Sequence, residues 1–163
     1  MVILKWIVIV IIGLVVLLIL AGQLGLLRGQ APADLGVRDG KLKRPSLTPN
    51  SVTSQADLFP DHPRRDYARI APLPMQGDAT ATLARIKSLV EKMPGAAVIE
   101  SRADYLYAQF TTSLMKFVDD VEFWADPATG AVQVRSASRI GHGDRGLNRA
   151  RIEAIRAALQ APA

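Results

Sequence analysis

The chain has 163 residues and no cysteine, which excludes disulfides, thiolate metal sites and a cysteine nucleophile. Its net charge of +5 is a mild basic excess of the kind found near anionic lipid. It lacks the dense basic stripe, interleaved with aromatics, that nucleic-acid binders carry, so we expect no nucleic-acid partner.

A long apolar run dominates the N-terminal end. Between Lys5 and Arg28 stand 22 residues, of which Gln23 alone has a polar side chain. As a helix these residues would be about 33 Å long, close to the hydrocarbon thickness of a bilayer, about 30 Å. We therefore expect residues 1–27 to form a membrane anchor, with the lipid bilayer as the partner of residues 6–27.

Two alternatives concern this segment. Residues 31–33 (Ala-Pro-Ala) have the small-x-small pattern of a signal-peptide cleavage site, but the apolar run is longer than an ordinary signal peptide has, which favours an uncleaved anchor. The basic residues after the run favour a cytoplasmic domain, whereas Lys5 directly before it favours export. We expect a single-pass protein of a bacterial inner membrane with its soluble domain in the periplasm.

Proline and glycine mark the next part of the chain. Seven of the ten prolines fall within residues 28–77, where they disfavour helices and central strands. Residues 28–48 are predicted to be a linker, and 49–51 (Pro-Asn-Ser) give a turn signal. Residues 68–75 are predicted to form an edge strand.

The remaining residues predict an α+β domain over residues 49–163. Asp78 is expected to cap a helix at 79–93, since Leu83, Ile86 and Val90 share one face. A second helix is expected at 147–159. Between the helices lie four strand-like runs, at 97–102, 105–113, 116–124 and 131–139. The short connections imply antiparallel pairing. The predicted order is β-α-β-β-β-β-α, with a sheet of four to five strands covered on one face by the two helices.

Alternation along the strands assigns two faces. The helix-covered face is apolar except for Asp119, whose nearest hydrogen-bond donors by pattern are Ser136, Ser138 and Asn148. The arginines of the final helix are expected to lie mostly on its other faces. The opposite face of the sheet gathers aromatic and charged residues, namely Tyr105, Tyr107, Gln109, Asp120, Glu122, Trp124, Gln133 and Arg135. We expect either a solvated face with cross-strand pairs such as Glu122 with Arg135, or a docking surface.

Three strings resemble the domain-of-unknown-function 1499 (DUF1499) family: PNSVTSQA, FVDDVEFW and VQVRSASRIGHGDRGLNRARIEAIRAAL. The resemblance covers about residues 49–159. It implies a bacterial or plastid-associated protein, often exported or anchored, with no established reaction. The family's recurrent positions fall on Asn50, Ser51, Ser54, Asp119, Asp120, Glu122, Arg135, Ser136, Ser138, Arg139, Asp144, Asn148 and Arg149. The chain has Ser51 where many relatives have cysteine and His142 where many have tyrosine.

We expect a non-catalytic binding or structural module of the cell envelope, with an envelope protein as a further partner. The candidate binding residues are Asn50, Ser51, Asp119, Asp120, Arg135, Ser136, Ser138, Arg139, Asp144, Asn148 and Arg149. Arginines there could clamp a carboxylate or phosphate, or could fix the loop before the last helix by pairing with acids. No catalytic residue, metal site or cofactor is expected.

Two alternatives remain. A hydrolase using Ser51 or Ser136 with His142 lacks the G-x-S-x-G elbow. The second alternative is a protein that binds anionic lipid headgroups.

The sequence does not favour a metal site. Asp119, Asp120, Glu122, His142 and Asp144 could supply ligands, but they lack the spacing of a known metal motif, and alternation places Asp119 and Asp120 on opposite faces.

Overall fold

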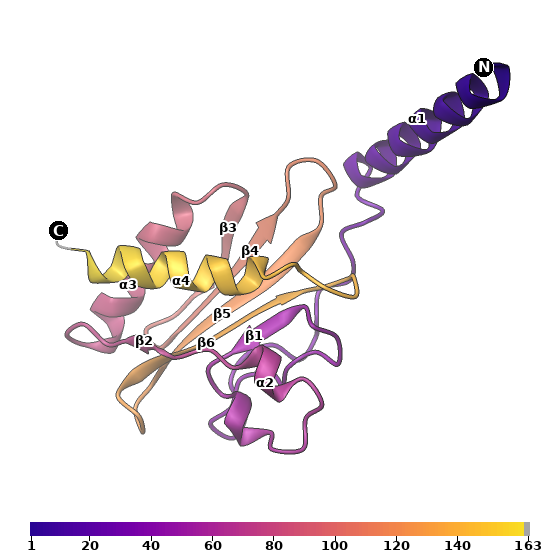
Figure 1. Ribbon diagram of the computed structural model, residues 1–163. Coiled ribbons are helices and arrows are strands. Elements are labelled where there is room, and N and C mark those ends of the chain that lie inside the picture. Colours follow the sequence, from indigo (N-terminus) through magenta and orange to yellow (C-terminus); the bar gives the residue numbers. More distant parts are fainter. Residues whose placement is uncertain (162–163) are drawn as a thin grey trace.

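The computed structural model describes residues 1–161 and shows a long N-terminal helix projecting from an α+β head (Figure 1). This helix, α1 (Val2–Gln23), has only two polar side chains, Lys5 and Gln23, and nearly all of its apolar side chains are exposed. It is long and apolar enough to cross a membrane, as the N-terminal sequence predicts.

The head is built on one antiparallel sheet of six strands. The strands follow the order β1-β6-β5-β4-β3, and β2 also pairs with β6. Their bounds are Ser51–Thr53 (β1), Leu73–Pro74 (β2), Ala96–Ser101 (β3), Tyr105–Thr111 (β4), Val118–Asp126 (β5) and Ala131–Ser138 (β6). The four C-terminal strands confirm the prediction, with ends shifted by one or two residues.

The N-terminal part of the sheet differs from its prediction. Residues 68–75 do not form one strand, because Arg65–Ala68 is a helical turn (α2) and the strand β2 is restricted to Leu73–Pro74. Ser51–Thr53, which begins at the last residue of the turn expected at 49–51, is a strand that pairs with β6 and was not predicted. This pairing joins residues more than 80 positions apart, so no local pattern signals it. A short 3-10 helix, η1 (Ala56–Leu58), connects β1 to α2.

Two helices cover one face of the sheet, as predicted (Figure 1). In α3 (Ala79–Glu91), the Asp78 carboxylate accepts a hydrogen bond from the Ala81 amide at 2.7 Å, which confirms the expected cap. The second helix is α4 (Leu147–Gln160). Apolar side chains of both helices pack on those of the sheet and form the main core, which includes Ile86, Val121, Phe123, Val134 and Ile152.

The opposite face of the sheet is covered as well, which corrects the expectation of a solvated or docking face. Leu42, from the segment predicted as a linker, is 2% exposed and packs in a cluster with Tyr105, Tyr107 and Trp124. The Gly36 amide donates to Glu122 Oε1 at 2.7 Å. Residues 35–42 therefore form a second layer under the sheet, and their sequence, which has two glycines and no helix or strand periodicity, does not predict this packing.

The N-terminal helix α1 is joined directly to the head. Gln23 Nε2 donates to the carbonyl oxygens of Leu114 at 2.8 Å and of Ser113 at 3.3 Å, in the loop between β4 and β5. Gly22 is buried against the same loop, where a Cβ atom would lie 2.7 Å from the Met115 carbonyl oxygen. The end of the sheet that carries this loop is therefore the end nearest α1 (Figure 1).

Candidate functional site

Asp119 lies on the helix-covered face, where the alternation of β5 predicts it. Its carboxylate does not use the serine or asparagine donors that the pattern indicated. It pairs with Arg151 of α4, whose Nη2 lies 2.5 Å from Asp119 Oδ2. Arg151 was expected to point away from the sheet; its guanidinium instead lies 4.5 Å from the centroid of the Phe110 ring. Leaving a buried carboxylate without a cationic partner costs more free energy than placing one arginine on the buried side of α4.

Asn148 is the centre of the adjoining hydrogen-bond network. Its Oδ1 accepts from Ser136 Oγ at 2.5 Å and from Arg151 Nη1 at 2.7 Å. Its Nδ2 donates to Ser138 Oγ at 3.1 Å and to the Asn50 carbonyl at 3.0 Å. This fully buried amide therefore joins the start of α4 to both β6 and the residue before β1.

Asp144 fixes the first turn of α4. Its two oxygens accept from the amides of Gly146 at 3.0 Å and Asn148 at 2.9 Å, and Tyr67 donates its hydroxyl proton to Oδ1 at 2.5 Å. Burial would raise the pKa of Asp144, but these hydrogen bonds outweigh it and the pKa lies below the usual range. Burial and the neighbouring carboxylate raise the pKa of Tyr67 to about 12.

Two acid–arginine pairs lie on the other face of the sheet. Asp120 accepts a bidentate contact from Arg139, at 2.9 Å to Nε and 2.8 Å to Nη2, and a hydrogen bond from the Tyr107 hydroxyl at 2.6 Å. Glu122 pairs with Arg135 at 3.4 Å, directly across the β5–β6 ladder, as the alternation of side chains along the two strands predicts. Burial, and then the charge of Glu122, raise the pKa of the Tyr105 hydroxyl that donates to this carboxylate.

The serines of the hydrolase hypothesis have other partners. Ser51 Oγ accepts from the Ser46 amide at 2.8 Å, and Ser136 Oγ lies between Asn148 and Arg151. His142 is exposed, and among residues 1–161 no hydrogen bond joins it to Ser51, Ser136 or Ser138. No group of three or more His, Asp or Glu side chains in the same residues could hold a metal ion.

The predicted binding residues thus fall into separate groups rather than one cleft. Asp120, Arg135 and Arg139 lie on the face beneath residues 35–42. Ser51 shares that face and accepts a hydrogen bond from the Ser46 amide. The others gather around the start of α4, and Arg149 donates to the Tyr67 carbonyl at 2.6 Å. Most are buried: Asn50, Ser51, Asp119, Asp120, Arg135, Ser136, Asp144 and Asn148. These residues hold the head together, and as a ligand site they stay a prediction.

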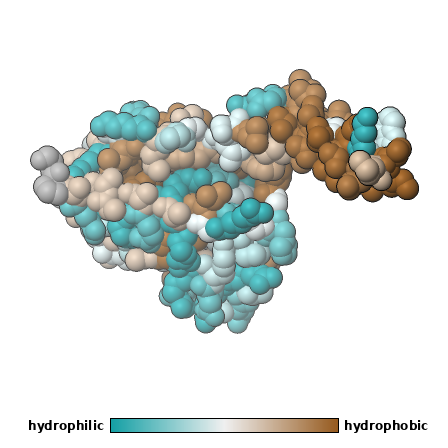
Figure 2. Space-filling view, turned by 45° about the horizontal axis from the view of Figure 1, so that its top comes forward, coloured by the Kyte–Doolittle hydropathy of each residue, from teal (hydrophilic) through white to brown (hydrophobic). Residues whose placement is uncertain are grey.

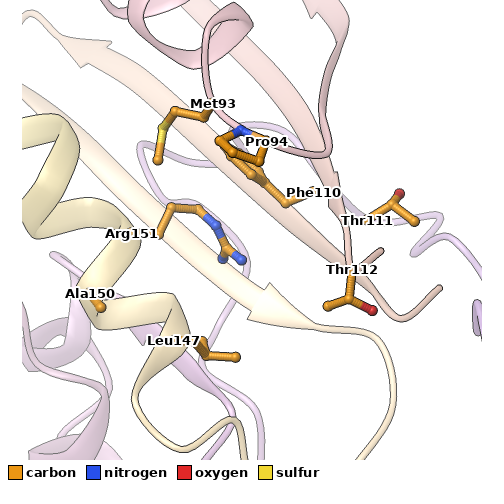
Figure 3. A pocket seen from close by; sticks show the side chains of 8 residues that line it. All are labelled: Met93, Pro94, Phe110, Thr111, Thr112, Leu147, Ala150 and Arg151. Carbon is orange, nitrogen blue, oxygen red and sulfur yellow. The ribbon is translucent and has the colours of Figure 1, made fainter. Parts of the chain in front are cut away.

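A pocket of about 290 Å³ opens beside this network, at the end of the head that contacts α1 (Figure 3). It is lined by Met93, Pro94, Phe110, Thr111, Thr112, Leu147, Ala150 and Arg151. The Arg151 side chain reaches from α4 toward Phe110 on β4, and Leu147 and Ala150 line the helical wall (Figure 3). Apart from this arginine and two threonines, the lining is apolar.

Sequence reasoning missed Arg151, Tyr67 and Phe110 as parts of this region. One signal was available for Arg151. An acid on an apolar strand face, facing a helix that carries three arginines, indicates that one of those arginines is its partner. No such signal existed for Tyr67, which lies in a segment expected to be irregular and meets Asp144, 77 residues later, by tertiary packing alone.

A family model described as "Protein of unknown function (DUF1499)" matches residues 41–159. The match begins just before the buried Leu42 and ends at Leu159, the last core residue of α4. No curated protein and no solved structure matched the chain.

Proposed function

The chain belongs to the DUF1499 family, and we propose that it is a single-pass, non-catalytic binding module of a bacterial inner membrane. Its head lies in the periplasm and binds the acyl chain of a membrane lipid in the pocket beside Phe110. The observation that carries this proposal is the position of the pocket: Thr112 lines it, and the next residue, Ser113, contacts the anchor helix through Gln23.

The internal pairing of polar groups argues against catalysis. A general base needs a free lone pair within hydrogen-bond reach of its target, and a serine nucleophile needs such a base. Here Asp119 and Asp120 are each neutralised by an arginine, and Ser136 is held between Asn148 and Arg151. Their arrangement supports a rigid scaffold for binding.

The pocket's chemistry favours an uncharged, apolar ligand. Met93, Pro94, Phe110 and Leu147 supply most of its wall, and burial of apolar surface is the main driving force available there. The charge of Arg151 is compensated by Asp119 at 2.5 Å, so it adds little net attraction for an anion. An acyl chain meets these requirements, and the bilayer beside the anchor supplies it.

Photo-cross-linking in vesicles tests the proposal. The full-length protein is reconstituted with a phospholipid that carries a diazirine in its acyl chain. Cross-links are then mapped by mass spectrometry. We expect them in α1, which serves as an internal reference, and in the pocket segments 93–94, 110–112 and 147–151.

Ala150→Trp fills the pocket and should remove the cross-links in those segments while leaving those of α1. Ala154→Trp is the matched control, because it places the same side chain on the same helix at an exposed position outside the pocket. Pocket cross-links that are missing from the wild type, or that survive in Ala150→Trp, would overturn the lipid assignment.

A further inference from the structure

Exposed apolar side chains gather at the end of the head that touches the anchor. Leu114 is 55% exposed in the β4–β5 loop, and Phe117 is 36% exposed at its end. Ile140 (38%) and Leu147 (57%) lie in and after the loop that precedes α4. We call these four residues the anchor-end rim.

The contacts of the two loops place the rim residues side by side. The Arg139 amide donates to the Val118 carbonyl at 3.0 Å, which brings Ile140 next to Phe117. A Cβ on Gly29, just after the anchor, would lie 2.8 Å from Ile140 Cγ2. Leu147 and Thr112 line the same pocket. In Figure 2 the brown surface of α1 continues onto the adjoining part of the head.

Three cations lie next to this apolar rim in the chain. Arg28 follows the anchor, Lys116 lies in the β4–β5 loop, and Arg145 precedes α4. Among residues 1–161 none of the three has an ion-pair partner; the one acid of these loops, Asp144, is engaged by Tyr67 and the amides of the α4 turn. An exposed apolar patch ringed by basic side chains is the pattern of a surface that lies in the headgroup region of an anionic bilayer.

We infer that the anchor-end rim rests in the interface of the same bilayer that α1 spans, with Arg28, Lys116 and Arg145 on anionic headgroups. This inference rests on the proposed anchoring but not on the lipid-chain pocket. The observation that supports it most directly is the contact between α1 and the rim: Gln23, at the end of α1, is hydrogen-bonded to the loop that carries Leu114. The head is then held against the membrane in one orientation, with the mouth of the pocket facing the lipid.

Depth-dependent quenching tests the contact. Because the chain has no cysteine, single-cysteine variants of the full-length protein can each carry one NBD fluorophore. The test variant is Leu114→Cys. Ile12→Cys, in the middle of α1, reports anchoring, and Ala128→Cys, in the β5–β6 turn at the far end of the sheet, is the exposed control. Vesicles contain brominated phosphatidylcholine with or without phosphatidylglycerol.

We expect quenching at Ile12→Cys and Leu114→Cys, none at Ala128→Cys, and stronger quenching at Leu114→Cys when phosphatidylglycerol is present. Quenching at Ile12→Cys without quenching at Leu114→Cys would overturn the rim contact and leave the anchor intact. No quenching at either position would overturn the anchoring as well. Equal quenching with and without phosphatidylglycerol would overturn the headgroup contact.

Discussion

At the scale of single residues, the chain uses ionisable groups mainly as structural links. Asp119 and Arg151, with 8% and 12% of their side chains exposed, form the clearest example. The pair is held further by Asn148 and by the Phe110 ring. Removing one partner of a buried pair leaves the other without compensation, so this link can be tested directly.

Arg151→Ala should lower the free energy of unfolding by about 3–5 kcal/mol, because it leaves the Asp119 carboxylate buried and unpaired. Urea unfolding of the detergent-solubilised protein measures this. The double variant Asp119→Asn/Arg151→Met removes both charges and should be more stable than Arg151→Ala alone. If the single variant is as stable as the wild type, the pair has no structural role.

Asp144 makes the start of α4 sensitive to acid. Its pKa lies below the ordinary value of 3.8, so its contribution to stability is fully present above about pH 4 and is lost as the pH falls through the folded-state pKa. Asp144→Asn should therefore lose thermal stability at neutral pH and show a smaller further loss on acidification. Melting temperatures measured from about pH 7 to pH 3 test this across the range where aspartates titrate. Asp61→Asn, at an exposed position, should leave the wild-type profile unchanged.

At the scale of elements, the segment of residues 35–42 acts as a second layer although it has almost no regular structure. Leu42→Ala should destabilise the head by about 2–5 kcal/mol, as truncation of a buried leucine does. It should also admit water to Trp124, which packs in the same cluster. In a Trp6→Phe background Trp124 is the one tryptophan, so a red shift of its emission reports the change. Leu47→Ala, at an exposed leucine, should give no shift.

The joint between α1 and the head depends on Gly22. Gly22→Leu has no space for its side chain, because a Cβ already lies 2.7 Å from the Met115 carbonyl oxygen. Hydrogen exchange at the amides of residues 113–116 should therefore become faster. Gly13→Leu, in the same helix but with nothing within 4 Å of a Cβ, should leave that exchange unchanged. Equal effects of both substitutions would mean that the loop does not dock through Gly22.

Local sequence patterns predicted the elements that depend on residues close to one another in the chain. The helical spacing of Leu83, Ile86 and Val90 predicted α3, and alternation predicted that Asp119 and Glu122 lie on opposite faces of β5. The missed features all depend on contacts distant in sequence: β1 on β6, Leu42 on Trp124, Arg151 on Asp119 and Tyr67 on Asp144. The sequence therefore listed most residues of the polar network but, apart from Glu122 with Arg135, did not indicate which residues pair with each other.

At the scale of the whole molecule, the head packs directly against the end of α1. The β4–β5 loop is at the end of the sheet nearest α1, and residues after α1 return beneath the sheet to cover its second face (Figure 1). The path from anchor to head is therefore short and packed rather than a free tether.

The side of the membrane on which the head lies follows from the proposed export and can be measured with introduced cysteines. Asp61→Cys, at an exposed position of the head, should react with a membrane-impermeant maleimide in cells whose outer membrane alone is permeabilised. Val2→Cys, at the N-terminal end of α1, should react after the inner membrane is opened with detergent. The reverse pattern would place the head in the cytoplasm, where the basic residues after α1 would be retained according to the positive-inside rule.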